Sequence, residues 1–178
     1  MWCFIEDKLG PSAVLGSKPD PKTAADAWIL SKLQRSKREL RKLLEAYRFG
    51  EAYELVYHLV WDDFADWYIE AAKIEPNPSL LSFGLETVLK LAHPFAPFVT
   101  ETIWQTLSGA GNNSLLITSP WPEVPDAKAS EAASFEEIKS IVEEIRFIQS
   151  SLKHRKFTLY HLGDDWLTTH GRLIKTLA

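Results

Sequence analysis

The feature that most constrains this chain is a series of long segments in which apolar residues return at helical spacing. The first lies between residues 23 and 47, with apolar side chains at Ile29, Leu33, Leu40, Leu43, Leu44 and Tyr47. Side chains three or four positions apart share one face of an α-helix. Thr23 followed three residues later by Asp26 resembles a capping box, so the helix is expected to begin there. Phe49-Gly50 is expected to end it.

The same spacing continues along the chain and predicts further helices. They cover residues 51–73, 78–93, 100–107, 134–152 and 164–178. Pro94 and Pro97 should interrupt helical hydrogen bonding after the second of these, because proline donates no backbone bond. Ser134 and Glu137 are expected to cap the fourth, and Leu115–Thr118 is expected to be a short extended piece. Long helices with short connections indicate an antiparallel bundle.

The C-terminal part of the chain has a different pattern. Residues 123–133 are acidic and rich in alanine, which indicates a linker, and Phe157–Leu162 alternates like a β-strand. We therefore predict a mainly α fold, with an antiparallel helical bundle over residues 1–125 and a small α/β appendage, a helix-strand-helix extension, over residues 126–178. A lone strand is not stable, and residues 1–9 look like the end of a helix without a cap. We expect that neighbouring segments have been removed at both ends.

Composition excludes several classes of protein. The single cysteine, Cys3, cannot form an internal disulfide framework or a multi-cysteine zinc site. A chain of this kind suits a reducing compartment, and we expect a cytoplasmic location. No apolar run reaches the roughly 18–20 residues that span a bilayer, so no membrane partner is expected. The N-terminus lacks the basic region and cleavage site of a secretory signal.

Catalytic and metal-binding patterns are also missing from the sequence. No glycine-rich phosphate loop is present, so we expect this chain alone to carry no active site. Asp62, Asp63 and Asp66 cluster on one predicted helix, but a solvated face explains them better than a metal. The five histidines lack paired ligand spacing on any helix face. We expect neither a metal nor a catalytic residue in this chain.

Two groups of side chains suit nucleic-acid binding. Basic residues crowd the first long helix at Lys32, Arg35, Lys37, Arg38, Arg41 and Lys42. Such a basic stripe is an electrostatic footprint for phosphate, although a solvated face paired with acidic helices has the same pattern. The run from Trp61 to Ile69 is rich in aromatic residues, and helical spacing places Trp61, Phe64 and Tyr68 on one face. The net charge of −4 argues mildly against a dedicated nucleic-acid binder.

Several segments together resemble the anticodon-binding domain of valyl-tRNA synthetases. The resemblance is carried by Asp26–Leu33, Tyr47–Ala52, Val60–Lys73, Leu91–Glu101, Ile103–Gln105, Ser119–Pro122 and Ile145-Arg146. Leucyl and isoleucyl enzymes share the His93-Pro94-Phe95 segment. The Trp-x-x-Phe-x-Asp-Trp-Tyr spacing, which begins at Trp61, favours the valyl family.

The resemblance implies a role in recognition. It implies that the domain binds tRNA, with valine isoacceptors expected, and that a catalytic domain of the same parent protein uses ATP to join valine to that tRNA. No cofactor is implied for this chain. Three residues match anticodon-facing positions of the family: Phe4, Ile69 and Lys73, the last as a phosphate contact. Cys3 stands where the family usually has arginine, and the family's coiled-coil arm would lie beyond residue 178.

Two alternatives remain open from the sequence. One is the same domain of an isoleucyl- or leucyl-tRNA synthetase. The other is a helical protein-interaction module that binds no RNA. A shift with tRNA that weakens as salt rises would separate the two classes, because phosphate contacts release counterions.

Overall fold

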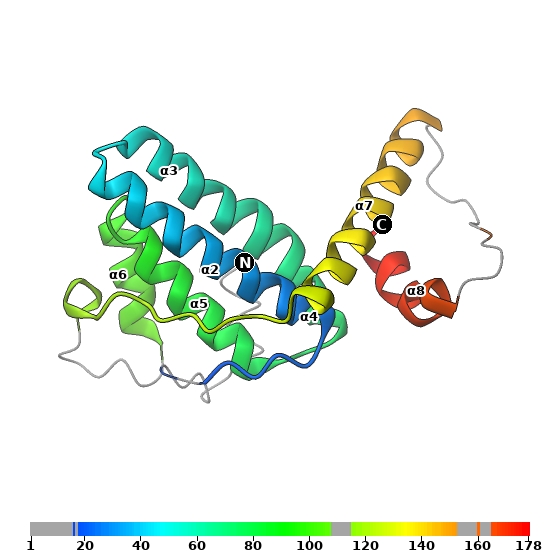
Figure 1. The fold of residues 1–178 in the computed structure, drawn as a ribbon, viewed down its shortest axis with the longest axis horizontal. Coiled ribbons are helices and arrows are strands. Elements are labelled where there is room, and N and C mark those ends of the chain that lie inside the picture. Colours follow the sequence, from blue (N-terminus) through cyan, green and yellow to red (C-terminus); the bar gives the residue numbers. More distant parts are fainter. Residues whose placement is uncertain (1–15, 17, 108–114, 153–159, 161–164) are drawn as a thin grey trace.

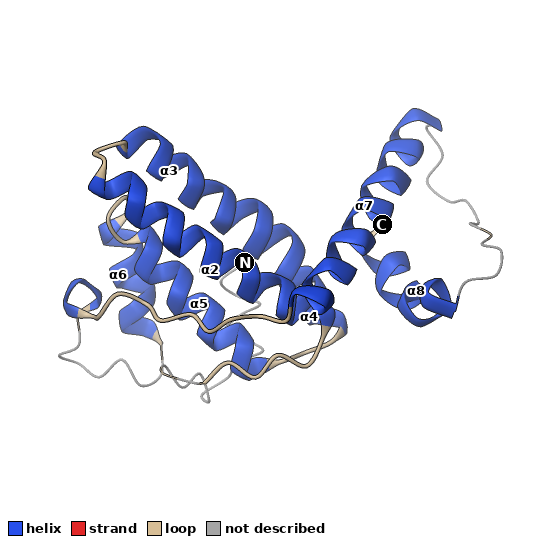
Figure 2. Ribbon diagram, in the orientation of Figure 1, coloured by secondary structure: helices blue, strands red, loops and turns tan. Residues whose placement is uncertain are grey.

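The computed structural model describes residues 16, 18–107, 115–152, 160 and 165–178. In Figure 1, the helices of the N-terminal part of the chain lie side by side, and the helices drawn in yellow to red stand at one end of them. The elements are α2 (Ala24–Glu45), α3 (Phe49–His58), the π-helix η2 (Leu59–Tyr68), α4 (Ile69–Ile74), α5 (Pro78–Ala92), α6 (Pro97–Thr106), the 3-10 turn η3 (Leu116–Thr118), α7 (Ala129–Leu152) and α8 (Asp165–Leu177). The predicted helical bundle is confirmed, and the part of the chain described here contains no strand (Figure 2).

Helix α2 begins where the capping residues predict. The backbone N–H of Asp26 donates to Thr23 Oγ1 at 3.1 Å, and the N–H of Thr23 donates back to Asp26 Oδ2 at 3.2 Å. These bonds satisfy donors that an uncapped helix would leave without partners. The apolar face of α2 is buried almost completely, with Ile29, Leu33 and Leu40 each 0% exposed. This face forms the centre of the core.

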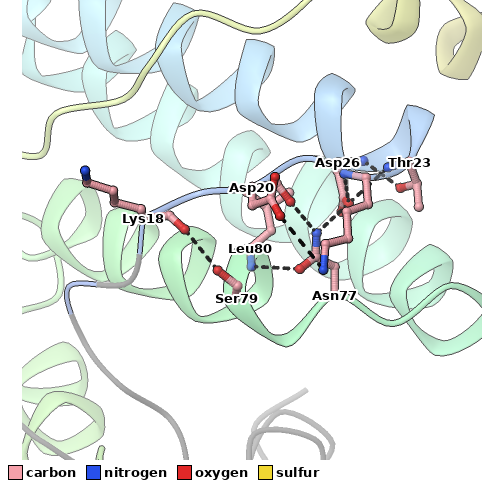
Figure 3. A network of polar contacts seen from close by, with 8 residues as sticks. Lys18, Asp20, Thr23, Asp26, Asn77, Ser79 and Leu80 are labelled. Atoms are coloured by element: carbon pink, nitrogen blue, oxygen red, sulfur yellow. Dashed lines mark hydrogen bonds and ion pairs between the residues drawn. The ribbon is translucent and has the colours of Figure 1, made fainter.

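Asp26 also has a second role, as the centre of a buried polar network (Figure 3). Its side chain is 1% exposed. Tyr68 Oη donates to Asp26 Oδ1 at 3.0 Å, while Asn77 Nδ2 and the N–H of Lys22 donate to Oδ2 at 2.8 and 2.9 Å. Burial, and then the neighbouring carboxylate of Asp26, raises the pKa of Tyr68 well above its ordinary value. The phenol therefore stays protonated and remains a donor.

The network connects three segments that are distant in sequence. Asn77 Nδ2 also donates to the carbonyl of Asp20 at 2.8 Å, and Asn77 Oδ1 accepts from the N–H of Leu80 at 3.4 Å, which caps α5. The loop before α2 and the start of α5 therefore meet at the Asp26 carboxylate (Figure 3), and Tyr68 at the end of η2 bonds to the same carboxylate. Every buried side-chain polar atom in the described part of the chain has a hydrogen-bond partner.

The second long helix is continuous from α3 through η2 to α4, but its middle is wound as a π-helix. The N–H of Ile69 bonds to the carbonyl of Phe64, five residues earlier. Because this turn is wider than an α-turn, the faces differ from those that a regular helix predicts. Phe64 and Tyr68 are buried together, with ring centroids 5.7 Å apart, but Trp61 is 50% exposed and Trp67 is buried instead. Trp61 therefore lies outside the packed core that holds Phe64 and Tyr68.

The proline break and the C-terminal segments give mixed outcomes. Helix α5 ends at Ala92 and α6 begins at Pro97, so the predicted interruption is confirmed. Residues Leu116–Thr118 form a 3-10 turn, which corrects the predicted extended piece. Helix α7 begins at Ala129, so the predicted start at Ser134 is wrong: the alanine-rich stretch is itself a good helix former. Most of the predicted strand over residues 157–162 lies outside the described residues.

Helix α7 packs against the bundle. It crosses the N-terminal half of α2, where the rings of Trp28 and Phe135 lie 5.0 Å apart. Phe135, Ile138 and Val142 are each 0% exposed and belong to the same core as α2. Within the described ranges, no helix is both long and apolar enough to cross a bilayer.

We predict that Asn77→Ala lowers the free energy of unfolding by about 2–4 kcal/mol, because it leaves the buried Asp26 carboxylate short of a donor. Ser79→Ala is the control: it removes one bond to the Lys18 carbonyl beside solvent and should cost less than about 1 kcal/mol. Chemical denaturation of the two variants measures both values. Equal losses would show that the carboxylate does not depend on Asn77.

A second pair of variants tests the packing of α5 against η2. A Cβ atom at Gly84 would lie 2.8 Å from Cε2 of the buried Phe64 ring. Gly84→Ala should therefore cost about 1–3 kcal/mol through overpacking. A Cβ at Gly50, in the first turn of α3, meets no atom within 4 Å. Gly50→Ala should stabilise the protein by up to about 1 kcal/mol, and thermal unfolding of both variants would reveal the opposite signs.

Candidate nucleic-acid interface

Two of the three predicted anticodon-facing residues, Ile69 and Lys73, lie on α4, one buried and the other exposed. Ile69 is 3% exposed and belongs to the hydrophobic core. Lys73 is on the surface, with 42% of its side chain exposed, and forms an ion pair with Glu70 one turn earlier. Phe4 lies outside the described residues. In this conformation Lys73 is accessible to a phosphate, whereas Ile69 is not accessible to a base.

Helix α8 is packed beside α4 and explains part of this burial. Leu173, Ile174 and Leu177 of α8 are buried and belong to the same core as Ile69. Arg146 of α7 donates from Nη2 and Nε to the carbonyl of Leu177, at 2.6 and 3.1 Å. A cation at a helix C-terminus satisfies carbonyls that otherwise have no partner. The sequence gives no sign that α8 would pack at this end of the bundle.

The basic stripe of α2 is divided into two parts with different surroundings. Lys32, near the N-terminal end, is partly buried and pairs with two carboxylates: its Nζ lies 3.0 Å from Glu136 Oε1 and 3.6 Å from Asp63 Oδ1. Toward the other end, Arg41 pairs with Glu45 at 2.9 Å and Lys42 with Glu39 at 3.2 Å. Acidic partners for the basic stripe, which the alternative to phosphate binding predicts, are therefore present for these three residues.

Three members of the stripe have no ion-pair partner among the residues that the structure describes. Arg35 is exposed, Lys37 is half-buried, and the exposed Arg38 donates to Gln34 Oε1 at 3.4 Å. Ion pairs between exposed side chains are worth little and exchange readily with other charges. The part of the stripe from Arg35 to Lys42 therefore remains able to contact phosphate, although Glu39 and Glu45 reduce its net positive charge.

A cluster of cations and indoles holds α7 against the bundle, and we call it the α7 clasp. Trp28 Nε1 donates to Glu136 Oε1 at 2.8 Å. Lys139 Nζ lies 5.1 Å from the ring centroid of Trp67 and 5.7 Å from that of Trp28. The guanidinium carbon of Arg146 also lies 5.1 Å from the Trp67 ring. Cations over indole rings attract the negative face of the ring, so the clasp uses basic residues to pack helices.

Two carboxyls in the α7 clasp are shifted in opposite directions. Burial raises the pKa of Asp63, and the nearby Lys32 and Lys139 only partly oppose that rise. Burial also acts to raise the pKa of Glu136, but hydrogen bonds from Trp28 and Lys32 and the charge of both lysines lower it overall. Ionised Glu136 therefore contributes to stability, whereas ionised Asp63 opposes it.

An apolar groove runs along the opposite side of α3 and η2, and we call it the aromatic groove. It lies between α3–η2 and α5–α6 and has a volume of about 410 Å³. Its rim includes Tyr53, Tyr57 and Trp61, which are 53%, 45% and 50% exposed. Their spacing of four residues is visible in the sequence and would have indicated this surface. None of the lining residues is charged, so the groove offers no positive charge to phosphate.

Metal binding has no candidate in the described ranges, because no group of three or more His, Cys, Asp and Glu side chains there could hold an ion. The nearest approach to a polar site pairs His58 Nδ1 with Asp62 Oδ2 at 2.6 Å on the surface. His93 Nδ1 lies 2.8 Å from Thr100 Oγ1 across the proline break. His58 and Asp62 are one turn apart on one helix, whereas His93 and Thr100 belong to either side of the break, and neither pair has the arrangement of a catalytic centre.

Comparison with known proteins identifies where this architecture recurs. Residues 26–156 match the family described as the anticodon-binding domain of tRNA ligase. The valine–tRNA ligase of Geobacillus kaustophilus (strain HTA426) is 40% identical over 140 residues, which cover 72% of this chain and 16% of that protein. The valine–tRNA ligase of Staphylococcus aureus (strain JH9) is 37% identical over 142 residues, which cover 74% of this chain and 15% of that protein. The chain thus spans about one sixth of the length of these curated relatives.

We predict that the α7 clasp gives the protein a specific pH dependence. Because the pKa of Glu136 is lower in the folded chain, its contribution to stability is present above the ordinary pKa of a glutamate and is lost as the pH falls through the lowered pKa. Glu136→Gln should lower the free energy of unfolding by about 0.5–1 kcal/mol at pH 7, since the side chain is half exposed. The difference from the unaltered chain should shrink as the pH falls below the ordinary carboxyl range.

Asp63→Asn is the matched control, with the opposite sign. The pKa of Asp63 is raised by folding, so its favourable contribution belongs to the protonated form and is lost as the pH rises. Replacing it with a neutral amide should leave the stability at pH 7 unchanged or higher. Urea titrations at several pH values measure both variants, and a loss for Asp63→Asn at pH 7 would contradict this assignment.

Proposed function

The chain belongs to the anticodon-binding domain family of tRNA ligases, and we propose that it binds the anticodon arm of tRNA, with valine isoacceptors as its substrates. The observation that supports this most strongly is the family match, which spans α2 to α7 and so includes the bundle and the α7 clasp. The names of the two relatives support valine as the amino acid. In this proposal the domain supplies recognition in the cytoplasm.

Under this proposal, a different domain of the parent protein catalyses the joining of the amino acid to tRNA. A catalytic domain would join valine to tRNA with ATP, and this chain would hold the anticodon arm so that the acceptor end reaches that domain. No group in the described residues has the geometry to activate an amino acid or bind a nucleotide through a glycine-rich loop. The catalytic domain is therefore the second expected partner, beside tRNA.

The RNA contact is assigned to the end of the bundle formed by α4. Lys73 is the side chain there that suits a phosphate, because it is exposed and its ion pair with Glu70 lies at the surface. A base could reach Ile69 only after α8 moves, because Ile69 is buried in this conformation. Stacking on one base is worth about 1–3 kcal/mol. Because about 4 kcal/mol corresponds to 1 mM, stacking by itself gives the chain alone an affinity no better than about millimolar.

A protein-interaction module remains the second candidate, and the aromatic groove is the observation that favours it. Exposed aromatic side chains around an apolar cavity are typical of protein-binding surfaces. The groove and α4 use different faces of the bundle, so the two functions are compatible. An isoleucyl or leucyl relative differs from the main proposal only in the tRNA that it selects.

Binding to anticodon stem-loops tests the proposal, and two lysines form a matched pair for it. Lys73 and Lys42 each pair with a glutamate three residues earlier on an exposed helix face, but they lie toward opposite ends of the bundle. Lys73→Ala should weaken binding of the valine stem-loop by about 3–10-fold and reduce the salt dependence by about one phosphate contact. Lys42→Ala should change binding by less than about 2-fold.

Fluorescence anisotropy with labelled stem-loops measures these effects at several salt concentrations. A stem-loop with an isoleucine anticodon is the specificity control and should bind more weakly. A larger effect of Lys42→Ala than of Lys73→Ala would place the RNA on the stripe of α2. Indifference of the complex to salt would show that the interaction is not with phosphate.

We further predict that the chain alone does not activate valine. Activation requires an ATP site, and none of the patterns that form one occurs in the sequence. Valine-dependent pyrophosphate exchange should therefore stay at the level of a buffer control. Exchange above that level, removed by further purification, would indicate a contaminating synthetase, whereas exchange that persists would contradict the prediction.

A further inference from the structure

The second half of α2 and the turn that follows it form the positive pole of the chain. Residues 35–51 contain six arginine and lysine side chains and three glutamates, which gives this segment a net charge of +3. Because the whole chain carries −4, all its other residues together carry −7. A polyanion is therefore attracted to this segment more strongly than to the rest of the molecule.

Three of these cations, Arg35, Arg38 and Lys42, recur at helical spacing and share one exposed face of α2. Among the described residues, Arg35 has no ion-pair partner and Arg38 donates only to the amide oxygen of Gln34, at 3.4 Å. Asp126, from the loop before α7, reaches the same stretch of α2, but its carboxylate accepts from Gln34 and not from a cation. The two arginines therefore carry charge that no neighbouring carboxylate neutralises.

The surface between these cations offers charge and no apolar contact. From Arg35 to Lys42, which we call the outer stripe, the one apolar residue is Leu40, and it is 0% exposed. A protein-binding surface has an apolar centre, and lysine is depleted there. Guanidinium and ammonium groups are the usual partners of phosphate. The outer stripe therefore fits the backbone of a nucleic acid better than the surface of a protein.

Tyr47, in the turn between α2 and α3, has a backbone conformation that glycine adopts more easily. Its φ is 57°, and the turn bonds back to the carbonyls of Leu44 and Leu43 at 3.1 and 2.9 Å. Helices that end in this way usually have glycine at the position of Tyr47. The ring is 79% exposed and lies edge-on to Phe49, with ring centroids 6.1 Å apart. The side chain thus adds backbone strain and little packing, as is typical of residues that serve binding.

The outer stripe and this turn lie far from α4. The bond between Tyr68 and Asp26 places the start of α2 beside the end of η2, and α2 runs antiparallel to α3 and η2, away from α4 (Figure 1). At 1.5 Å per residue, Arg38 and the turn lie about 18 and 30 Å from Asp26, whereas Lys73 lies about 7 Å from it in the other direction. A paired stem of about five base pairs extends only about 17 Å at about 3.4 Å each. An anticodon stem held at α4 therefore ends before the turn.

We propose that the outer stripe and the Tyr47–Phe49 turn form a second RNA-binding surface, which contacts the part of the tRNA outside the anticodon arm. Arg35, Arg38 and Lys42 bind phosphate groups of the backbone, and the exposed ring of Tyr47 stacks on an unpaired base. This inference rests on the proposed function, because that function places the anticodon arm at α4.

Binding of two RNAs tests the outer stripe: full-length valine tRNA and its anticodon stem-loop. Arg35→Gln with Arg38→Gln should weaken tRNA binding by about 5–20-fold and lower its salt dependence by about two phosphate contacts. The same double variant should weaken stem-loop binding by less than about 2-fold. Lys18→Gln with Lys22→Gln is the matched control, because it removes two exposed positive charges from the loop before α2, and it should alter the binding of neither RNA by more than about 2-fold.

The outcomes separate this inference from the proposed function. Equal weakening of tRNA and stem-loop binding would overturn the inference, because it would place the anticodon arm itself on the outer stripe. Equal effects of the two double variants would also overturn it, because they would show attraction by overall charge. If the unaltered chain binds neither RNA, the proposed function fails as well. If both RNAs bind the outer-stripe variant and the unaltered chain equally, only this inference fails.

Tyr47→Gly separates binding from folding at the turn. Glycine adopts a φ of 57° without strain, so the thermal midpoint of unfolding should stay the same or rise. Binding of full-length tRNA should nevertheless weaken by at least about 3-fold, because a stacked base loses its partner. Tyr47→Phe keeps the ring and should keep the affinity. Unchanged tRNA binding by Tyr47→Gly, or weaker binding together with a lower midpoint, would overturn the role of Tyr47 in this surface.

Discussion

The carboxylate of Asp26 is the contact on which the arrangement of the bundle depends. It closes the first turn of α2, accepts the phenol of Tyr68 from the end of η2, and accepts the amide of Asn77 from the start of α5. A buried charge is costly unless its lone pairs are satisfied, so each of the three elements must lie where it can donate. One side chain thereby fixes the relative positions of α2, η2 and α5.

The same principle explains why charged groups near α7 serve packing more than recognition. Lys32, Lys139 and Arg146 are basic, but each is held by a carboxylate, an indole ring or a backbone carbonyl. A basic stripe in a sequence therefore overstates the positive surface available to RNA. Among the predicted RNA contacts, the accessible positive charges are Lys73 and the basic residues of α2 between Arg35 and Lys42. This is consistent with weak binding by a chain whose net charge is −4.

Local signals could be predicted from the sequence, whereas contacts between distant elements could not. The Thr23 capping box and the break at Pro94 and Pro97 depend on neighbouring residues, and both are confirmed. Helix α7 begins at Ala129, before the predicted cap at Ser134, because the alanine-rich stretch favours a helix. The burial of Ile69 and the docking of α8 depend on tertiary packing, and family resemblance identified the position of Ile69 without its surroundings. The exposure of Trp61 escaped prediction because a π-turn changes the period.

The π-helical winding of η2 makes the bundle sensitive to chain length as well as to side-chain identity. A π turn takes in one residue more than an α-turn, so deleting one residue between Leu59 and Tyr68 would favour winding as a regular α-helix and change which side chains of this segment face the core. Insertions and deletions in this segment are therefore a route by which related domains could change the face that they present at this end.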